Sequence, residues 1–282
     1  MSGFRAGKYF LSLNGPACIM GILNVTPDSF SDGGQNFHPE DAVAHALGMQ
    51  EQGAGMIDIG GQSTRPGFTA IPPQEEWERI EPVLKALQGR LSVPVSVDTF
   101  YPQVASLALS AGADVINDVN GFTDPGMFSA VRGSGCGCII MHNGHVLEED
   151  PEEDILIRVR RFFEDRLRQA HEIDIAQERI CFDPGVGFGK TDQENLRLIA
   201  NVGAVRIDGC ALLMAASRKG VIGKSCGNPP AEDRMPGTLA AHTLAQAGGA
   251  QLLRAHDVRE AVQAAQVAYA VLSAKVGGTS LG

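Results

Sequence analysis

Residues 93–118 read VPVSVDTFYPQVASLALSAGADVIND, and this stretch decides the fold. An apolar run ends in Asp98, a helix-like segment begins at Pro102, and a second apolar run ends in Asn117 and Asp118. Val- and Ile-rich runs without strict polar alternation are typical of strands that are covered on both faces. Two such runs joined through a helix predict parallel neighbouring strands.

The same unit recurs along the whole chain. The apolar runs are Cys18–Asn24, Met56–Gly61, Val93–Asp98, Ala113–Asp118, Cys138–His142, Arg179–Asp183, Ala211–Ser217 and Ala250–His256. The helical patterns that follow them are Glu40–Gln52, Pro73–Gly89, Pro102–Ala111, Pro125–Gly133, Glu153–His171, Asp192–Ile199, Met235–Gly248 and Val258–Lys275. Eight such units predict an α/β fold, a (β/α)8 TIM barrel with its active site at the C-terminal ends of the strands.

The competing fold is an open, doubly wound sheet. Its dinucleotide fingerprint would follow the first strand, where this chain reads NVTPDSF and has no G-x-G-x-x-G. The chain has 282 residues, a length that TIM barrels reach as one domain, and no Ser-, Pro- or charge-rich linker divides it. The sequence therefore predicts a single domain over residues 1–282, with its core at about 18–275.

Charge and cysteine usage restrict the partners and the compartment. The formal net charge of −10 argues against nucleic acid and anionic membranes, so any anionic ligand requires a local cluster of cations. Six scattered cysteines fit a reducing compartment, and neither a signal peptide nor an apolar stretch long enough to cross a bilayer is recognisable. We expect a cytoplasmic protein.

Each predicted strand ends in polar residues, which in a barrel converge on one mouth. In chain order these are Asn24, Gln62 with Ser63, Thr64 and Arg65, Asp98, Asn117 with Asp118, His142, Asp183, Ser217 with Arg218 and Lys219, and Arg254 with His256. A polar residue at a strand end can also simply cap the next helix, but eight such ends after apolar interiors favour a binding ring.

The ring divides by chemistry. Asp98, Asn117 and Asp183 offer acceptors for a flat heterocycle that carries an amino group beside a ring N–H. A cationic set would hold an anion such as phosphate, and it consists of Arg65, Lys219, Arg254 and His256. Asn24 is a neutral oxygen ligand of the kind that a Mg²⁺ ion bound mainly to diphosphate accepts.

Three loops have compositions suited to covering a site: Thr26–Gln35, Ser63–Thr69 and Asp183–Lys190. In the last, DPGVGFGK, the Walker spacing is missing, so we expect the glycines to allow close approach of backbone to ligand, with Lys190 exposed.

The motifs together resemble the dihydropteroate synthase family. In order they are MGILNVTPDSFSDGG (20–34), DIGGQSTRPG (58–67), SVDT (96–99), INDVNG (116–121), DPGVGFGK (183–190), SRKGVIG (217–223) and RAHDV (254–258). The resemblance runs from about Cys18 to Lys275. It implies a pterin-binding TIM-barrel transferase of folate biosynthesis, the target class of the sulfonamides, that joins (7,8-dihydropterin-6-yl)methyl diphosphate to 4-aminobenzoate and releases diphosphate and 7,8-dihydropteroate.

The resemblance also implies roles for individual residues. The pterin would be bound by Asp98, Asn117, Asp183 and Lys219, and the diphosphate by Asn24, Thr64, Arg65, Arg254 and His256. The aminobenzoate would lie against Arg65, Pro66, Phe188, Ser217 and Lys219, and Asn24 would ligate Mg²⁺. Asp98, Arg65 and Lys219 would be catalytic in an SN1-like reaction, in which the bond to diphosphate breaks before the amine attacks. A homodimer through the later helices is expected.

Two other functions remain open at this stage. A pterin-dependent methyltransferase component would share the barrel but has no use for STRPG, SRK and RAHDV, and a non-catalytic pterin-binding paralogue would keep the pocket without turnover. Three departures from the family pattern touch the pocket wall: Gln62 in place of a frequent Glu, the segment MHNGH (141–145), and MAASRK (214–219).

Overall fold

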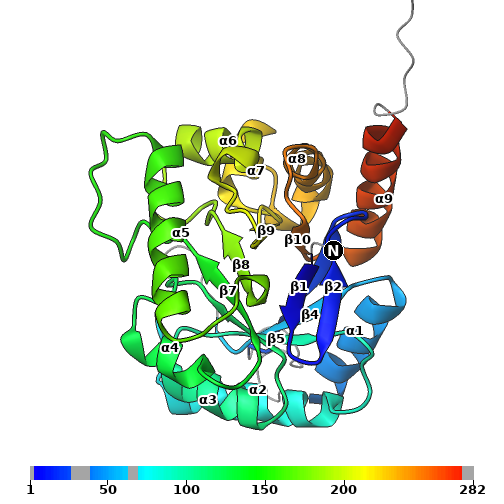
Figure 1. Cartoon of the computed structure of the whole chain (residues 1–282). Helices are drawn as coiled ribbons and strands as arrows, with labels where there is room; N and C mark the ends of the chain where they lie inside the picture. Colours follow the sequence, from blue (N-terminus) through cyan, green and yellow to red (C-terminus); the bar gives the residue numbers. More distant parts are fainter. Residues whose placement is uncertain (1–2, 27–38, 63–68, 275–282) are drawn as a thin grey trace, which may run out of the picture.

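Eight parallel strands form a closed barrel in the computed structural model, which describes residues 3–26, 39–62 and 69–274 (Figure 1). The barrel strands are β3 (Cys18–Asn24), β4 (Met56–Gly60), β5 (Val95–Asp98), β6 (Val115–Asp118), β7 (Gly137–Met141), β8 (Ile180–Asp183), β9 (Ala211–Met214) and β10 (Leu252–Ala255). Strands pair in chain order, and β10 pairs with both β9 and β3. This closure confirms the predicted TIM barrel and excludes the open sheet.

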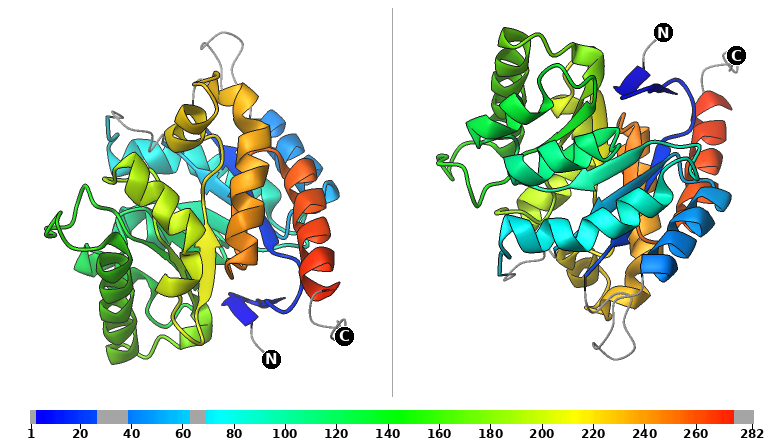
Figure 2. Two further views of the ribbon diagram at one scale, coloured as in Figure 1. Left: turned by 90° about the horizontal axis from the view of Figure 1, so that it is seen from above. Right: turned by 90° about the horizontal axis from the view of Figure 1, so that it is seen from below.

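Helices form a layer around the barrel (Figures 1 and 2). They are α1 (Pro39–Glu51), α2 (Pro73–Leu87), α3 (Pro102–Ser110), α4 (Pro125–Val131), α5 (Ile155–Glu172), α6 (Asp192–Ala200), α7 (Gly220–Ser225), α8 (Met235–Ala247) and α9 (Val258–Ala274), with 3₁₀ turns η1 (Gln177–Arg179), η2 (Val202–Val205) and η3 (Ala231–Arg234). As predicted, Pro73, Pro102 and Pro125 open their helices, because the missing N–H of proline costs nothing there. No helix in the described ranges is long and apolar enough to cross a membrane.

An N-terminal hairpin, which the sequence analysis did not predict, closes one end of the barrel. Strands β1 (Gly3–Ala6) and β2 (Tyr9–Ser12) pair antiparallel around Gly7, whose φ of 59° favours glycine. Phe4 is fully buried in the interior cluster with Met20, Met56, Val115 and Ile139. Figure 2 shows the hairpin at one end of the barrel. The carboxyl termini of the strands lie at the other end.

The alternation of side chains along each strand separates an apolar from a polar level inside the barrel. Met56 and Val115 belong to the apolar interior cluster, so Asp58 and Asn117, two residues further along, face the same interior. Intervening residues such as Ile57 and Ile116 face outward and pack in a second cluster with the helices. The barrel therefore presents its polar side chains above an apolar base.

Candidate active site

Four acidic or amide side chains from four strands lie buried at the polar level of the barrel. They are Asp58 of β4, Asp98 of β5, Asn117 of β6 and Asp183 of β8. Asp98 pairs in register with Asn117, and Asp58 lies two residues before Gly60, the β4 partner of Asp98, so the first three side chains lie close together on the inner face. We call these four side chains the acidic floor. Three of them were predicted, and Asp58 is an addition.

Arg254 of β10 neutralises part of the acidic floor. Its Nε donates to Asp58 Oδ2 over 2.7 Å, and its Nη2 donates to Asp98 Oδ2 over 3.0 Å. Asn117 Nδ2 donates to the same Asp58 oxygen over 3.1 Å. Among the described residues no group donates to Asp58 Oδ1, which is buried. One guanidinium thus serves two carboxylates, and acceptor capacity is left for a ligand with N–H donors.

Burial makes the charged forms of Asp98 and Asp183 costly. Desolvation is the largest influence on the pKa of Asp98, and it raises that pKa. Arg254 opposes this shift, and the neighbouring carboxylates Asp58 and Glu76 add to it. Desolvation also raises the pKa of Asp183, against the effect of Lys219. A heterocycle that donates paired N–H groups to these oxygens would stabilise their ionised forms, so the floor favours such a ligand over a purely apolar one.

Lys219 connects the floor to the loop after β8. Its side chain follows β9 and donates to the carbonyl of Val186, and its Nζ lies 4.6 Å from the centroid of the Phe188 ring. Burial lowers the pKa of Lys219 to about 8, and the charge of Asp183 opposes this shift. The structure therefore brings together Asp183, Phe188 and Lys219, which the sequence had placed on two separate motifs.

Ser217 and His256 meet at the ends of β9 and β10. Ser217 Oγ lies 2.9 Å from His256 Nδ1, and the backbone N–H of His256 donates to the same hydroxyl over 3.2 Å. Arg218, between Ser217 and Lys219, has a φ of 57°, and its N–H donates to Thr238 Oγ1 of α8. Helix α8 thus supports the backbone turn that carries Ser217 and Lys219.

Two predicted members of the ring, Asp118 and His142, do not face the mouth. Asp118 accepts hydrogen bonds from the backbone N–H groups of Asn120 and Phe122, each over 2.7 Å, and so holds the loop after β6. His142 is buried with its Nε2 3.0 Å from Glu149 Oε1 and its ring edge-on to that of Phe162. Asp118 and His142 each directly follow a residue that faces the barrel interior. Because neighbouring residues of a strand point to opposite faces, these two side chains face the helices.

Gln62 also contacts a helix. Its Nε2 donates to Glu76 Oε1 of α2 over 2.7 Å, and Thr99 Oγ1 donates to the second Glu76 oxygen over 2.5 Å. Burial raises the pKa of Glu76, and both hydrogen bonds lower it. The departure from the family pattern at Gln62 therefore provides a neutral donor for a buried carboxylate behind Asp98.

Asn24, at the end of β3, borders an open position beside the floor. A Cβ placed on Gly60 would lie 3.8 Å from Asn24 Oδ1 and 3.9 Å from Asp98 Oδ2, so the missing side chain leaves the two oxygens facing a common space. The described ranges contain no group of three or more His, Cys, Asp or Glu side chains that could hold a metal ion. Thr64, Arg65 and Pro66 lie outside the described residues, as do most of the two predicted loops Thr26–Gln35 and Ser63–Thr69.

The comparisons with known proteins agree with this geometry. A family model described as "Pterin binding enzyme" matches residues 20–256. Dihydropteroate synthase of Escherichia coli K12 is 41% identical over 261 residues, which cover 91% of this chain and 92% of that protein. The chain belongs to the dihydropteroate synthase family.

Solved structures of dihydropteroate synthases have the same fold. The Xanthomonas albilineans enzyme with 4-aminobenzoic acid is 40% identical, with a TM-score of 0.89 and coverage of 99% of both chains. The Yersinia pestis enzyme in complex with a sulfonamide drug is 37% identical, with a TM-score of 0.86 and coverage of 96% of this chain and 99% of that one. Membership of the dihydropteroate synthase family therefore extends over nearly the whole chain.

Proposed function

We propose that this chain condenses (7,8-dihydropterin-6-yl)methyl diphosphate with 4-aminobenzoate to give 7,8-dihydropteroate and diphosphate, and that its sites are those assigned from the sequence. The observation that carries the proposal is the acidic floor with Arg254 and Lys219 beside it. A pterin offers the paired N–H donors that buried carboxylates lack, and the cations would meet the diphosphate.

The proposed mechanism needs no protein nucleophile. The bond between the pterin methylene carbon and diphosphate oxygen breaks with its electron pair leaving on the oxygen, and the amine of 4-aminobenzoate then forms the C–N bond and loses one proton to water. Asp98 would lie nearest the positive charge that develops on the pterin, while Arg65, Arg254 and His256 would neutralise the leaving diphosphate. Lys219 would border both substrates. Fixed charges in a water-poor pocket stabilise such a transition state without reorganisation.

The residues at the mouth fit a Mg²⁺ ion only if the ion takes most of its ligands from the bound diphosphate and from water. Asn24 supplies one neutral oxygen, as a hard cation that keeps most of its ligands from diphosphate and water requires. Bound there, Mg²⁺ would neutralise charge on the leaving group. The acidic floor would orient the pterin, and Asn24 Oδ1 would face the space beside Gly60.

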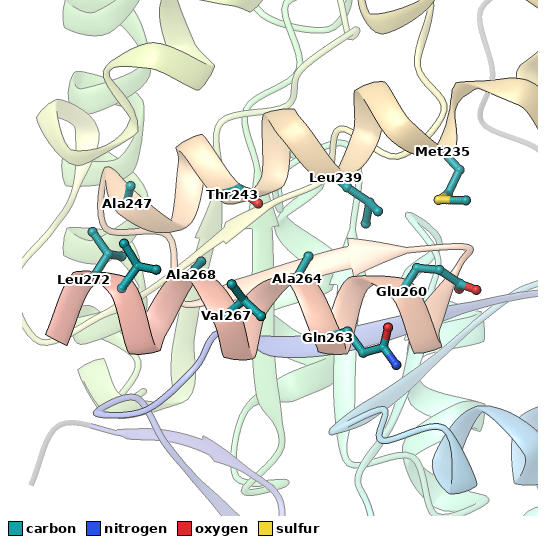
Figure 3. A pocket seen from close by; sticks show the side chains of 11 residues that line it. Met235, Leu239, Thr243, Ala247, Glu260, Gln263, Ala264, Val267, Ala268 and Leu272 are labelled. Carbon is teal, nitrogen blue, oxygen red and sulfur yellow. The ribbon is translucent and has the colours of Figure 1, made fainter. Parts of the chain in front are cut away.

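We further propose that the chain acts as a homodimer through α8 and α9. Between these helices lies a groove of about 760 Å³ lined by Leu239, Val267 and Val271. Figure 3 shows Leu239 and Val267 on its two sides. Val267 is 64% exposed and Val271 55% exposed. Because each copy carries a net charge of −10, two copies would repel each other over most of their surfaces, so this largely uncharged face suits a second copy.

All six cysteines are free thiols, five of them at least partly buried, and this supports a reducing cytoplasmic compartment. We propose that residues 1–282 work there as one pterin-binding domain with a core at about 18–275. A methyltransferase component and a non-catalytic paralogue are less well supported, because relatives named dihydropteroate synthase match over nine tenths of the chain.

One assay tests the reaction. The purified chain is expected to release diphosphate only when the pterin diphosphate, 4-aminobenzoate and Mg²⁺ are all present, with dihydropteroate formed in equal amount. Diphosphate release without 4-aminobenzoate would indicate a hydrolase. No diphosphate release at saturating substrates would indicate a non-catalytic paralogue. Methyl transfer from a methylated pterin would indicate a methyltransferase component.

A further inference from the structure

The loop between β8 and α6 folds around the ammonium group of Lys190, which is partly buried. In residues 183–190, DPGVGFGK, three glycines have positive φ: Gly185 at 68°, Gly187 at 86° and Gly189 at 62°. These left-handed residues turn backbone carbonyls inward, a geometry that other residues adopt only with strain. The carbonyls converge on the side chain of Lys190.

Lys190 Nζ donates to three backbone carbonyls, those of His142, Gly185 and Phe188, each over 3.0 Å. Three acceptors at one nitrogen match the three N–H donors of an ammonium, whereas a neutral amine has two. Burial lowers the pKa of Lys190 to about 7, and Asp183 opposes the shift. Lys190 is therefore an internal cross-link between the end of β7 and the glycine loop, and the expectation that it is exposed is wrong.

The packing around Lys190 leaves the loop little freedom. A Cβ on Gly185 would lie 2.0 Å from the carbonyl oxygen of His142, and a Cβ on Gly189 would lie 2.4 Å from the backbone of Gly144. The N–H of Gly144 also donates to the Phe188 carbonyl over 3.3 Å. Backbone thus packs directly on backbone, and Lys190 satisfies the carbonyls that this contact buries.

Phe188 lies between the two lysines of the site. The Lys190 ammonium donates a hydrogen bond to the backbone carbonyl of Phe188, and the Lys219 ammonium lies 4.6 Å from the centroid of the Phe188 ring. The ring orientation of a glycine-flanked residue depends on its backbone, because its neighbours provide no side chains to hold it. A hydrogen bond that holds the Phe188 carbonyl therefore fixes the point from which the ring projects toward Lys219.

We propose that Lys190 is a positioning residue for the 4-aminobenzoate site, acting through Phe188. It touches neither substrate; its ammonium fixes the backbone that sets the Phe188 ring against Lys219. The inference rests on the proposed function, since Phe188 is assigned to 4-aminobenzoate there. The proposed pterin ligands are Asp98, Asn117, Asp183 and Lys219, and the hydrogen bonds of Lys190 go to backbone carbonyls and to none of these side chains. The charge of Lys190 does interact with that of Asp183.

The test is a mutant cycle on the full chain. Lys190→Met keeps the length and apolar stem of the side chain and removes the three donors, so the KM for 4-aminobenzoate should rise about tenfold or more, as expected for loss of charge-assisted hydrogen bonds. The kcat at saturating 4-aminobenzoate and the Kd for a pterin without diphosphate should change less than about threefold. Lys85→Met, at an exposed position of α2, is the control and should match wild type.

The second arm separates positioning from general loss of structure. In a Phe188→Ala background, Lys190→Met should raise the KM little further, because its effect passes through the missing ring. Full additivity of the two changes, or equal losses of pterin and 4-aminobenzoate binding, would overturn the proposal. If Lys190→Met does not fold, Lys190→Gln retains two donors and should show the same selective rise in KM, smaller in size; an unchanged KM there would also overturn it.

The outcomes distinguish a failure of this inference from a failure of the proposed reaction. A wild-type chain without turnover contradicts the proposed function. A wild-type chain that turns over normally, with a Lys190→Met variant of unchanged KM, contradicts only the role of Lys190. A Phe188→Ala variant with an unchanged KM for 4-aminobenzoate removes the assignment of Phe188 on which the inference depends.

Discussion

Arg254 and Asp58 form an ion pair 196 positions apart in the chain, with Arg254 Nε donating to Asp58 Oδ2 over 2.7 Å; Asp58 is fully buried and the Arg254 side chain is 19% exposed. The same guanidinium also reaches Asp98. A buried charge that loses its partner is far more destabilising than a surface charge, so this pair links the stability of the barrel to the chemistry of its mouth. The consequences can be measured.

Replacing Arg254 tests both aspects. Arg254→Met leaves Asp58 without its cation and Asp98 without a hydrogen-bond donor, and we expect a loss of about 3–5 kcal/mol in the free energy of unfolding, measured by denaturant titration. Where the variant is folded, diphosphate should lose more affinity than a pterin without diphosphate. Equal losses of the two ligands would contradict the assignment of Arg254 to the diphosphate, and unchanged stability would contradict its role on the floor.

Asp183→Asn is expected to weaken pterin binding without destabilising the fold. Asp183 Oδ1 accepts the N–H of Gly185 over 2.8 Å, and an amide oxygen can accept the same bond. The lost charge should raise the Kd for pterin at least tenfold, as for a charge-assisted hydrogen bond worth about 1.5–3 kcal/mol, in calorimetric titrations. A large fall in Tm with unchanged affinity would show that Asp183 is a structural residue.

The dependence of stability on pH should change in Asp98→Asn. Burial raises the pKa of Asp98 from 3.8 to about 8. Between these pH values the folded chain holds a proton that the unfolded chain has lost, so this group makes stability fall as pH rises. The variant lacks this contribution, and its Tm should decline less than that of wild type from pH 4 to 8. Parallel Tm curves would rule out the shift, and the exposed Asp208→Asn serves as control.

The proposed dimer should dissociate on a charge placed in its groove. Val267→Glu puts a carboxylate on the α8–α9 face, where two copies would bring the new charges together and bury them. Sedimentation velocity should then report the 29.8 kDa mass of one chain in place of twice that mass. Ile157→Glu, at an exposed apolar position of α5, should leave the mass unchanged. A wild-type chain that sediments as a monomer would refute the dimer.

Periodicity in the sequence predicted the barrel because the feature it detects, an apolar run followed by an amphipathic helix, is the unit that the fold repeats. It missed α7, whose residues include Gly220 and Gly223 and so give a weak helical pattern. It also missed the N-terminal hairpin, whose two four-residue strands carry little signal. Elements this short are specified by what they pack against.

The polar residues at strand ends predicted most of the acidic floor but not all of it. Asp98, Asn117 and Asp183 were predicted, whereas Asp58 was missed because it lies inside its strand. Counting every second residue from Met56 would have found it. The same count would have excluded Asp118 and His142, which follow inward positions directly. Lys190 could not have been placed this way, because its burial depends on the left-handed glycines around it.

The hairpin that closes the barrel has a consequence for the order of folding. Phe4 packs in an interior built partly from Ile139 and Cys181, and Arg5 pairs with Glu178 over 2.7 Å. During synthesis the first strand is therefore complete long before its docking surface exists. Contacts of such sequence separation form late because a long loop must close first. We therefore expect the hairpin to dock after the barrel strands that it packs against have formed.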